Sequence, residues 1–452
     1  MRALQQRDSD KMIRTPKLIL SSIIMAIASQ SFAASSDLIS LYQHAENYDS
    51  GIFAARSAFL AEQEGESLAL AGLLPSFNGS VSAGRTNTNN TNESQRDNSY
   101  KTLNYAVSLA QPLLNLPSWY TLSSAEQSTL RAQAVYLSAQ QNLIIDVASA
   151  YFNILREQEN LKSARSHEAA VKRQFEQARE QFDVGLIAIT DVHEAKASYD
   201  SSQTARIRFE GNLTIAIENL SRLTGEYTSE LSTLKSDFPI TLDPTDSSEA
   251  WVNSAFENNL NIKSADYALK ALESQLSSSN SQHLPTLDLN AGYSNSKLTN
   301  SNPANNEAEE GSISLTLNIP IYSGGATQAS VRQTRHQVEQ AKHLLASAQR
   351  QARLETRTEY INIKTNIQTV ESLKQNIISR ESALEATREG YKVGTRNIVE
   401  VLDAERNYFT ALKDYANARF DFVESNLRIR RSAGTLNMND LEILNAWLEP
   451  VK

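Results

Sequence analysis

The chain has 452 residues and an acidic balance, with 43 Lys or Arg against 52 Asp or Glu and a formal net charge of −9. Such a chain has no basic stripe with which to neutralise phosphates, which argues against nucleic acid as a partner. It has no cysteine, so disulfides, thiolate metal sites and thiol nucleophiles are excluded together. Only 15 Gly and 10 Pro interrupt it, which indicates a mostly helical protein with little loop.

The N-terminal residues have the pattern of an export signal. Basic residues precede an apolar stretch at 18–28, and small residues follow at the spacing that signal peptidase recognises. This pattern predicts a signal peptide over residues 1–33. The charged segment before Met12 does not fit such a signal, so Met12 is an alternative start to Met1. No later stretch approaches roughly eighteen uninterrupted apolar residues, so we expect no transmembrane helix in the mature chain.

The sequence from 182 to 192, FDVGLIAITDV, returns 209 residues later as YKVGTRNIVEV at 391–401. The same spacing, within one residue, links three further pairs of helix or strand breakers: Pro75 with Pro285, Pro112 with Pro320, and Gly225 with Gly434. Self-similarity at one fixed spacing is the mark of a duplicated structural unit. We therefore place a first structural repeat at 34–225 and a second at 263–434.

Four short stretches alternate between apolar and polar residues with a period of two, at 77–83, 103–109, 287–293 and 313–319. They predict one β-hairpin at about 75–112 and another at about 285–320. Alternation alone fits amphipathic hairpins on a soluble core as well as strands in a membrane, and the signal peptide favours the membrane. Four strands cannot close a barrel, and lipid tolerates no open sheet edge, so several chains would have to pool their strands.

Long helical stretches follow each hairpin. Residues 123–182 and 326–389 contain neither Gly nor Pro, and about sixty helical residues at ~1.5 Å each would reach about 90 Å. Apolar positions spaced by threes and fours are typical of a coiled coil. A Val-Gly pair then breaks each stretch, and return helices are expected at 191–223 and 398–432.

Each repeat therefore supplies a helical hairpin with a defined tip. The tip turns hold Val184 and Gly185 in the first repeat and Val393 and Gly394 in the second. Because strands and tips lie at opposite ends of each repeat, the sequence predicts a long rod with a membrane end and a distal helical end.

Three motifs indicate a family. His283 opens HLPTLDL, Ile319 opens IPIYSGG, and Tyr391 opens YKVGTRNIVEVLDA. Together with the duplication, these motifs make the chain similar to the TolC outer-membrane efflux proteins over about 37–447. The resemblance implies a mostly α fold with a small β part: a homotrimer whose twelve pooled strands form an outer-membrane β-barrel, continued by a long periplasmic α-helical barrel of coiled-coil hairpins.

The same resemblance implies a function. Such channels are passive exit ducts of tripartite multidrug efflux, of type I protein secretion, or of both, and they use no cofactor. They lie among the outer-membrane lipids of Gram-negative bacteria and extend into the periplasm. The expected partners are a periplasmic adaptor protein and an inner-membrane pump of RND or ABC type, with drugs or secreted proteins as cargo. The resemblance also implies equatorial segments, which we place at 226–262 and 435–452.

Gate residues carry over from the family by position. The contacts that hold the tunnel end shut correspond to Tyr391 with Asp191 and to Arg396 with Thr190, with Arg419 as a further member of the network. Loosening these contacts would let the inner hairpins swing outward. The tip turns defined above are the expected docking site for the adaptor.

The acidic ring that constricts the family's entrance corresponds to Glu400 and Asp403. Glu400 replaces the first Asp of an Asp-x-x-Asp pattern, so the longer side chain puts the aperture width in question. The two residues lie three positions apart on one helix face, and three copies would crowd six carboxylates around an axis, which should attract cations. In the alternative interpretation, Glu400, Asp403 and Glu405 form a solvated helix start that the helix dipole stabilises.

The sequence contains no enzyme motif. The six His residues show no metal-ligand spacing, so His167, His336 and His343 are interpreted as helical surface residues. No phosphate-loop Lys follows the Gly324-Gly325 turn. We therefore expect a channel and not an enzyme. Two other classes remain open: a secreted coiled-coil structural or adaptor protein without channel activity, and an outer-membrane barrel enzyme such as a lipase.

Overall fold

The computed structural model describes residues 37–88, 98–242, 247–299 and 306–450. The predicted signal peptide, and with it the choice between Met1 and Met12, lies outside the described residues, as do parts of both hairpin loops. All described residues belong to one compact unit.

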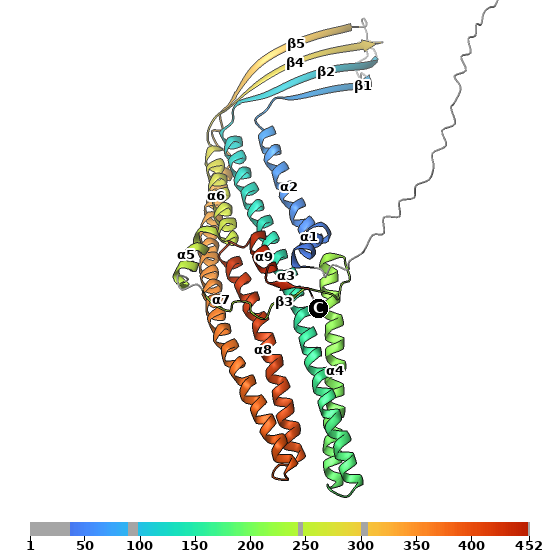
Figure 1. Ribbon diagram of the computed structural model, residues 1–452. Coiled ribbons are helices and arrows are strands. Elements are labelled where there is room, and N and C mark those ends of the chain that lie inside the picture. Colours follow the sequence, from blue (N-terminus) through green and yellow to red (C-terminus); the bar gives the residue numbers. More distant parts are fainter. Residues whose placement is uncertain (1–36, 89–97, 243–246, 300–305, 451–452) are drawn as a thin grey trace, which may run out of the picture. The chain divides into compact units, whose positions relative to one another are not determined.

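The order of elements in the first half of the chain recurs in the second half, which adds β3 before it and α9 and β6 after it (Figure 1). The first half comprises α1 (Leu38–Tyr48), α2 (Ser50–Ala71), β1 (Ser76–Thr88), β2 (Asn98–Leu114), α3 (Leu116–Asp183) and α4 (Ile189–Thr224). The second comprises β3 (Thr233–Leu234), α5 (Ser248–Asn258), α6 (Leu260–Ser281), β4 (Thr286–Thr299), β5 (Asn306–Asn318), α7 (Ala326–Lys392), α8 (Ile398–Ser432), α9 (Met438–Asn445) and β6 (Leu448–Glu449). Each half thus has a β-hairpin, a very long helix and a return helix, and the duplication with its repeat bounds stays a prediction.

The long helices α3 and α7 are possible because almost no helix breaker interrupts them. α3 has 68 residues, so it is about 100 Å long. It begins at Leu116, before the predicted start at 123, because Pro117 occupies the first turn, where no intrahelical amide bond is needed. Asn115 caps this end by accepting a hydrogen bond from the Ser118 amide at 3.1 Å. Among the described helices, none is long and apolar enough to cross a membrane.

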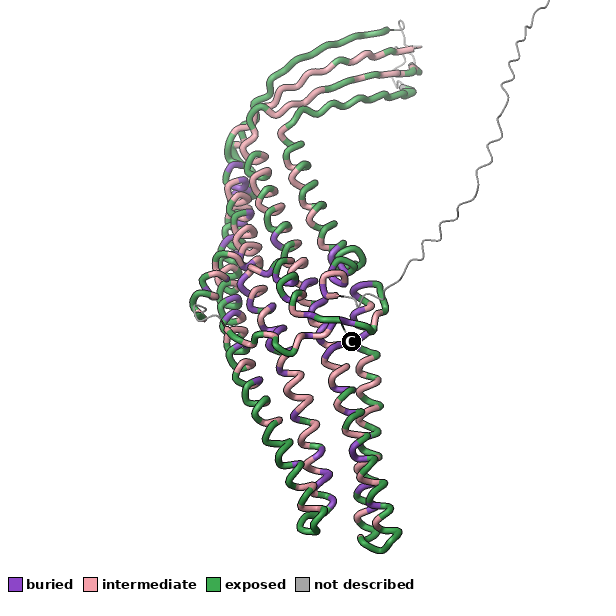
Figure 2. Tube along the Cα trace, viewed as in Figure 1, coloured by how far each residue is buried: buried purple, intermediate pink, exposed green. Residues whose placement is uncertain are grey.

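Strands β1, β2, β4 and β5 form one antiparallel sheet in that order, so β1 and β5 are its edges. The register opposes Val81 to Tyr105, Val107 to Tyr293, and Ala291 to Ile313. Directly opposed residues share a face, so these residues all belong to one apolar face. The positions between them are mostly Asn, Ser and Thr. Figure 2 shows that both edge strands are exposed along their length, and on the apolar face Phe77 is 71% and Ile313 81% exposed.

The largest core cluster lies where the long helices meet the predicted equatorial segments. Tyr151 and Phe152 of α3 are fully buried. The Phe152 ring centroid lies 6.0 Å from that of Phe420 on α8, and the Tyr151 hydroxyl donates to the backbone carbonyl of Ser232. Strands β3 and β6 pair with each other, which joins the two segments predicted to be equatorial, at 226–262 and 435–452. The hairpins α3–α4 and α7–α8 extend from this packed middle region (Figure 1).

Candidate functional site

The two hairpin tips are built by the same local geometry. At the end of α3, Gly185 has a φ of +80° and its amide donates to the Phe182 carbonyl at 2.8 Å. The next amide, of Leu186, donates to the Gln181 carbonyl at 2.8 Å. Gly394 repeats this arrangement at the end of α7 with a φ of +77°. These are Schellman motifs, in which a left-handed residue satisfies carbonyls that the helix end leaves open, so the repeated Val-Gly sequence sets where each long helix stops.

The tips present apolar side chains to solvent. Val184 is 71% exposed, Leu186 73% and Val393 74%. There is open space beside the Cα atoms of Gly185 and Gly394. The tip residues expected to dock an adaptor are therefore accessible, and that role stays a prediction.

Tyr391, in the last turn of α7, contacts the first hairpin. Its hydroxyl donates to Gln181 Oε1 at 3.1 Å, and its ring packs against an apolar cluster that includes Val171 of α3 and Ala195 of α4. Burial, followed by the negative charge of Asp191, raises the pKa of Tyr391. The predicted partner Asp191 thus lies within electrostatic range, whereas the hydrogen bond goes to a residue that sequence reasoning missed. Gln181 precedes Tyr391 by 210 residues, close to the repeat spacing, so equivalent helix ends of the two repeats meet.

Arg396 and Glu400 form an ion pair at the start of α8, with the guanidinium 3.0 Å from the carboxylate. Asn397 caps the helix, because its side-chain oxygen accepts from the Glu400 amide at 2.9 Å. Its side-chain amide also donates to the Glu400 carboxylate at 3.4 Å. Within the described part of one chain, Arg396 makes no hydrogen bond with Thr190, which lies in the first turn of α4. That contact stays a prediction.

Asp403 also has a basic partner. Its carboxylate lies 2.9 Å from the guanidinium of Arg406, one turn further along α8. Both carboxylates of the predicted ring are therefore paired with arginines of their own chain, Glu400 with one in the turn before α8 and Asp403 with one on α8. Their side chains are 40% exposed for Glu400 and 50% for Asp403. Exposed ion pairs of this kind contribute little free energy. Either carboxylate can therefore leave its arginine and bind another charged group. The ring role stays a prediction.

Glu405 is fully buried, so its interpretation as part of a solvated helix start is wrong. Arg388 of α7 donates to one of its carboxylate oxygens, and among the described residues the other oxygen has no partner. His167 of α3 faces the same region, and its ring centroid lies 5.3 Å from that of Phe409. Burial lowers the pKa of His167, an effect that the negative charge of Glu405 opposes and the positive charge of Arg406 reinforces. His167 is thus partly buried, and not the exposed helical surface residue that was expected.

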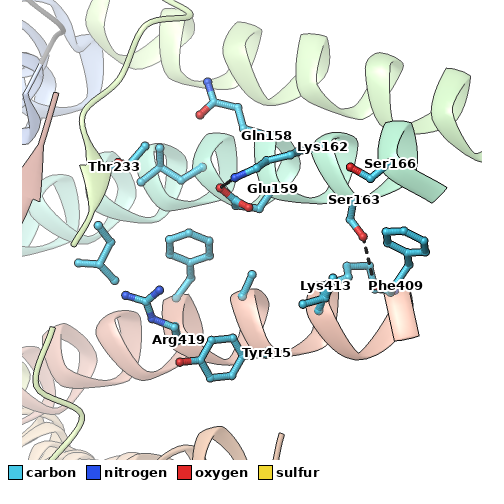
Figure 3. A pocket seen from close by; sticks show the side chains of 15 residues that line it. Gln158, Glu159, Lys162, Ser163, Ser166, Thr233, Phe409, Lys413, Tyr415 and Arg419 are labelled. Carbon is cyan, nitrogen blue, oxygen red and sulfur yellow. Dashed lines mark hydrogen bonds and ion pairs between the residues drawn. The ribbon is translucent and has the colours of Figure 1, made fainter. Parts of the chain in front are cut away.

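Arg419 lies on α8 far from the tip, beside a cavity of about 410 Å³ between α3 and α8 (Figure 3). Its guanidinium donates to the backbone carbonyl of Lys235 and lies 6.0 Å from the ring centroid of Tyr415. Elsewhere along the cavity the Ser163 hydroxyl donates to the Phe409 carbonyl at 3.1 Å. Arg419 thus joins α8 to the chain segment around Lys235, and its place in a gate network stays a prediction.

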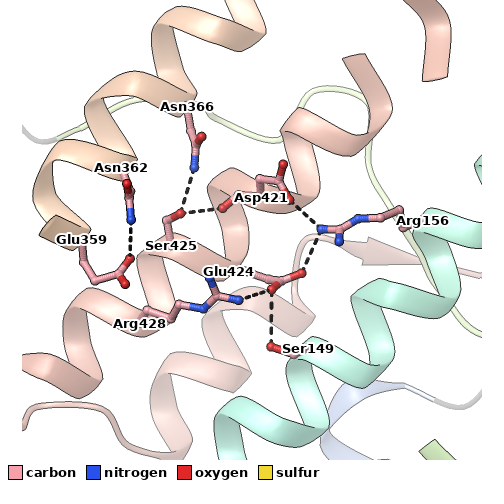
Figure 4. A network of polar contacts seen from close by, with 9 residues as sticks. All are labelled: Ser149, Arg156, Glu359, Asn362, Asn366, Asp421, Glu424, Ser425 and Arg428. Atoms are coloured by element: carbon pink, nitrogen blue, oxygen red, sulfur yellow. Dashed lines mark hydrogen bonds and ion pairs between the residues drawn. The ribbon is translucent and has the colours of Figure 1, made fainter. Parts of the chain in front are cut away.

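A cluster of ion pairs joins α3 to α8 near the core (Figure 4). Arg156 of α3 lies 2.6 Å from Asp421 and 3.1 Å from Glu424 of α8. Glu424 also lies 2.7 Å from Arg428 and accepts a hydrogen bond from Ser149 at 3.4 Å. Burial raises the pKa of Glu424, whereas the two arginines lower it. The two repeats are therefore held together by charges at mid-length.

Comparison with known proteins defines the class. The family model described as outer membrane efflux protein matches residues 41–226 and 251–435. The outer membrane protein TolC of Vibrio cholerae is 35% identical over 419 residues, covering 92% of this chain and 94% of that one. TolC of Escherichia coli is 33% identical over 357 residues, covering 76% and 72%. The alkaline protease secretion protein AprF of Pseudomonas aeruginosa is 26% identical over 416 residues, covering 90% and 86%.

Solved structures share the fold. A CusC structure superposes with a TM-score of 0.78 at 17% identity, covering 89% of this chain and 92% of that one. The Campylobacter jejuni CmeC outer membrane channel superposes with a TM-score of 0.76 at 16% identity, covering 97% and 98%. At such low identity the likeness shows the fold alone.

Fold and relatives together define an outer-membrane channel for efflux and secretion that extends into the periplasm. The chain belongs to the outer membrane efflux protein family. This membership confirms the resemblance, the mostly α fold with a small β part, the location and the channel function expected from the sequence. It also excludes the two alternatives, because the family consists of channels and not of enzymes or soluble structural proteins. Channels of this family work with adaptor and pump partners.

Proposed function

We propose that three copies of this chain assemble into one passive exit duct, which is closed at rest near the hairpin tips and opens when the hairpins move apart. The sheet supports the assembly, because β1 and β5 leave two open edges in one chain and open edges are not tolerated in lipid. Three chains with four strands each pool twelve strands into one closed sheet. Its apolar face then meets lipid, and its polar face lines the passage.

The contact of Tyr391 with Gln181 is the observation that carries the proposed gate. It joins α7 to α3 close to the hairpin tips, whereas ion pairs between α3 and α8 hold the same two hairpins together at mid-length. One hydrogen bond contributes only about 0.5–1.5 kcal/mol, so a partner can break it without unfolding the protein. Asp191 adds its charge beside this contact. We place the contact of Arg396 with Thr190 between neighbouring copies, and Arg419 steadies α8 against the equatorial segment.

The proposed entrance is narrowed by Glu400 and Asp403 of the three copies. Each carboxylate already has an arginine of its own chain, at 3.0 Å for Glu400 and 2.9 Å for Asp403. The entrance therefore carries alternating charges of both signs. When the arginines turn to other partners, as Arg396 would toward Thr190, the carboxylates are left to attract cations.

We infer the partners from the exposed hairpin tips and the cargo from the names of the relatives. The exposed turns with Val184, Gly185, Val393 and Gly394 are the proposed docking site of a periplasmic adaptor, which links the duct to an inner-membrane pump of RND or ABC type. The pump supplies the energy. AprF and the proteases secretion protein PrtF of Dickeya chrysanthemi are named for protein secretion, and BepC of Brucella suis for efflux. We therefore propose both secreted proteins and drugs as cargo.

Single-channel conductance in planar bilayers tests the duct and the gate together. The wild type should show a small, cation-selective conductance, and the Tyr391→Phe, Arg396→Ser double variant a several-fold larger one. The reason is that each lost contact of ~1 kcal/mol changes the ratio of open to closed states by about fivefold.

The matched control is Tyr199→Phe. The Tyr199 ring stacks on Phe175 in the same apolar cluster, with centroids 6.1 Å apart, so this variant loses a hydroxyl at the same end without losing the contact to Gln181. It should conduct like the wild type. Equal conductance of the wild type and the double variant would refute the gate. No current from either, despite confirmed insertion, would refute the duct.

A further inference from the structure

The two open edges of the sheet carry matching patterns on their apolar faces. On β1 the apolar face runs from Phe77 through Val81 to Ala83, and the next residue on that face is Arg85. On β5 it runs in the opposite direction from Leu317 through Leu315 and Ile313 to Gly311, and the next residue is Glu309. Toward the hairpin loops, both edges thus pass from apolar to charged residues, with opposite signs. The two positions are not level within one chain, because the pairing across the sheet sets Glu309 in line with Asn295, Tyr105 and Val81, four residues from Arg85.

Arg85 carries a charge that no carboxylate balances within the described part of the chain. Its Nε donates to the Ser99 hydroxyl at 3.3 Å, and the residue directly opposite on β2 is Lys101, which is exposed and also basic. Like charges directly opposite each other destabilise a strand pair. The edge β1 therefore has an excess of positive charge at this position.

On β5, Glu309 carries a negative charge that complements the positive charge of Arg85. The neighbouring acid on the same face, Glu307, has its own basic partner, Lys297, at 3.3 Å. Glu309 receives only a long hydrogen bond from the Asn295 side chain, at 3.4 Å, among the described residues. The edge β5 therefore has a negative charge that the described residues of its own chain do not neutralise.

Joining copies of the chain brings these two edges together. Successive strands of the sheet are antiparallel, so β5 of one copy would lie antiparallel to β1 of the next. The register of such a pair is set by matching its apolar residues, because a mismatch exposes or buries the wrong side chains. Matching Val81 with Ile313 or Leu315 places Arg85 directly opposite Glu309 or one diagonal step away. Long side chains interact at either position.

We propose that Arg85 of one copy forms an ion pair with Glu309 of the neighbouring copy, and that this pair fixes the register in which the sheets join. The inference rests on the proposed assembly and adds the contact that specifies it. A shift that moved Arg85 into line with Ile313 would set a guanidinium against an apolar side chain at the lipid-facing surface, where an unpaired charge is costly. The pair therefore selects one alignment of the edges over its neighbours.

A charge swap tests the pair by the heat resistance of the assembly in sodium dodecyl sulfate. Arg85→Glu and Glu309→Arg should each lower the midpoint for loss of the oligomer by a few degrees, and the double variant should recover most of that loss. Two double variants are matched controls and should not recover the heat resistance. The first combines Arg85→Glu with Glu310→Arg, which is one residue from Glu309 on the other face of the strand. The second combines Glu309→Arg with Lys101→Glu. If Arg85 instead binds lipid phosphate, Lys101→Glu will behave like Arg85→Glu and the swap will recover nothing, which overturns the proposal.

Cross-linking gives an independent test, because the chain has no native cysteine. Arg85→Cys with Glu309→Cys should be joined between copies by a short thiol-reactive linker. Arg85→Cys with Leu317→Cys should not, because Leu317 lies roughly 26 Å further along the strand at ~3.3 Å per residue. Efficient linkage of the second pair, or of neither pair, overturns the proposed register.

The size of the wild-type protein in detergent, measured by light scattering, separates the two proposals. Single chains would refute the proposed assembly itself. A trimer in which the swap gives no recovery would refute only the Arg85–Glu309 pair.

Discussion

Arg388 of α7 donates a hydrogen bond to Glu405 of α8, and the two residues differ sharply in exposure. The Glu405 side chain is completely buried, whereas that of Arg388 is 42% exposed. A buried carboxylate is tolerated only with a partner, so the arginine is what allows Glu405 to stay inside. The pair joins the two helices of the second hairpin.

Arg388→Met should therefore destabilise the protein more than Arg388→Met combined with Glu405→Leu. The single variant leaves a buried charge unpaired, at a cost of about 1–3 kcal/mol for a pair that is open to water on one side. The double variant removes the charge as well. Thermal unfolding in detergent and hydrogen exchange along α7 and α8 measure the difference. Lys392→Met, which breaks the exposed pair with Glu389, should change little, and a double variant no more stable than the single one would contradict this account.

Replacing the two carboxylates of the predicted ring with amides should remove their negative charge and also leave two arginines unpaired. Glu400→Gln with Asp403→Asn leaves Arg396 and Arg406 without their carboxylates in every chain. We expect cation selectivity to shift toward anions and block by divalent and trivalent cations to weaken, because the entrance then carries only positive charge. The reversal potential under a salt gradient measures the selectivity.

The control for the ring is Glu389→Gln. Glu389 lies in the last turn of α7 beside Lys392, with a carboxylate 63% exposed, so this change removes the same charge at the same end of the protein. It should leave selectivity nearly unchanged. If the amide variant keeps the cation selectivity of the wild type, Glu400 and Asp403 do not line the entrance.

The sequence predicted those parts of the fold that depend on local interactions. Gly185 and Gly394 mark the hairpin tips because helix termination needs only a left-handed residue and its neighbours. Alternation located all four long strands, although β1 continues to Thr88, beyond the predicted 77–83. Backbone pairing extends past the apolar stretch, because hydrogen bonding between strands does not depend on side-chain polarity.

Local sequence patterns could not predict how helices that are distant in the sequence pack against one another. Glu405 lies two residues after Asp403 on the same helix, yet one is buried and the other half exposed. The difference arises because α3 and α7 both pack against α8, and only one side of α8 faces them. The same long-range packing partly covers His167 and brings Gln181 to Tyr391. The spacing of apolar residues within one helix does not predict which other helix will pack against it.

Gly434→Ala should destabilise the protein far more than Gly394→Ala. Both glycines have positive φ, +74° and +77°, so each substitution brings a backbone strain of about 1–2 kcal/mol. A Cβ at Gly394 would meet open space, whereas a Cβ at Gly434 would lie 2.3 Å from the Asn258 carbonyl oxygen. Thermal unfolding in detergent should show a modest loss for the first variant and a much larger loss, or failure to fold, for the second. Similar losses for both would mean that the contact with Asn258 relaxes easily.

His167 should make the stability of the protein depend on pH. Burial lowers its pKa from the usual value of 6.5, so the folded state binds fewer protons than the unfolded state. The corresponding stability is present above about pH 6.5 and is lost as pH falls through the pKa of the unfolded state. We therefore expect the midpoint of thermal unfolding to fall between about pH 7 and pH 5, and His167→Gln to remove part of that slope.

The comparison between variants separates His167 from the carboxylates that also titrate in acid. His336→Gln is the matched control, because His336 is exposed on α7 and its replacement leaves the buried cluster intact. This control should keep the wild-type slope, whereas His167→Gln should be flatter because a neutral amide has no proton to gain. The neighbouring Glu405 opposes the effect and Arg406 reinforces it, so Arg406→Gln should weaken the slope without abolishing it. A His167→Gln protein whose slope equals that of the wild type would show that His167 gains its proton without loosening the packing of α3 on α8.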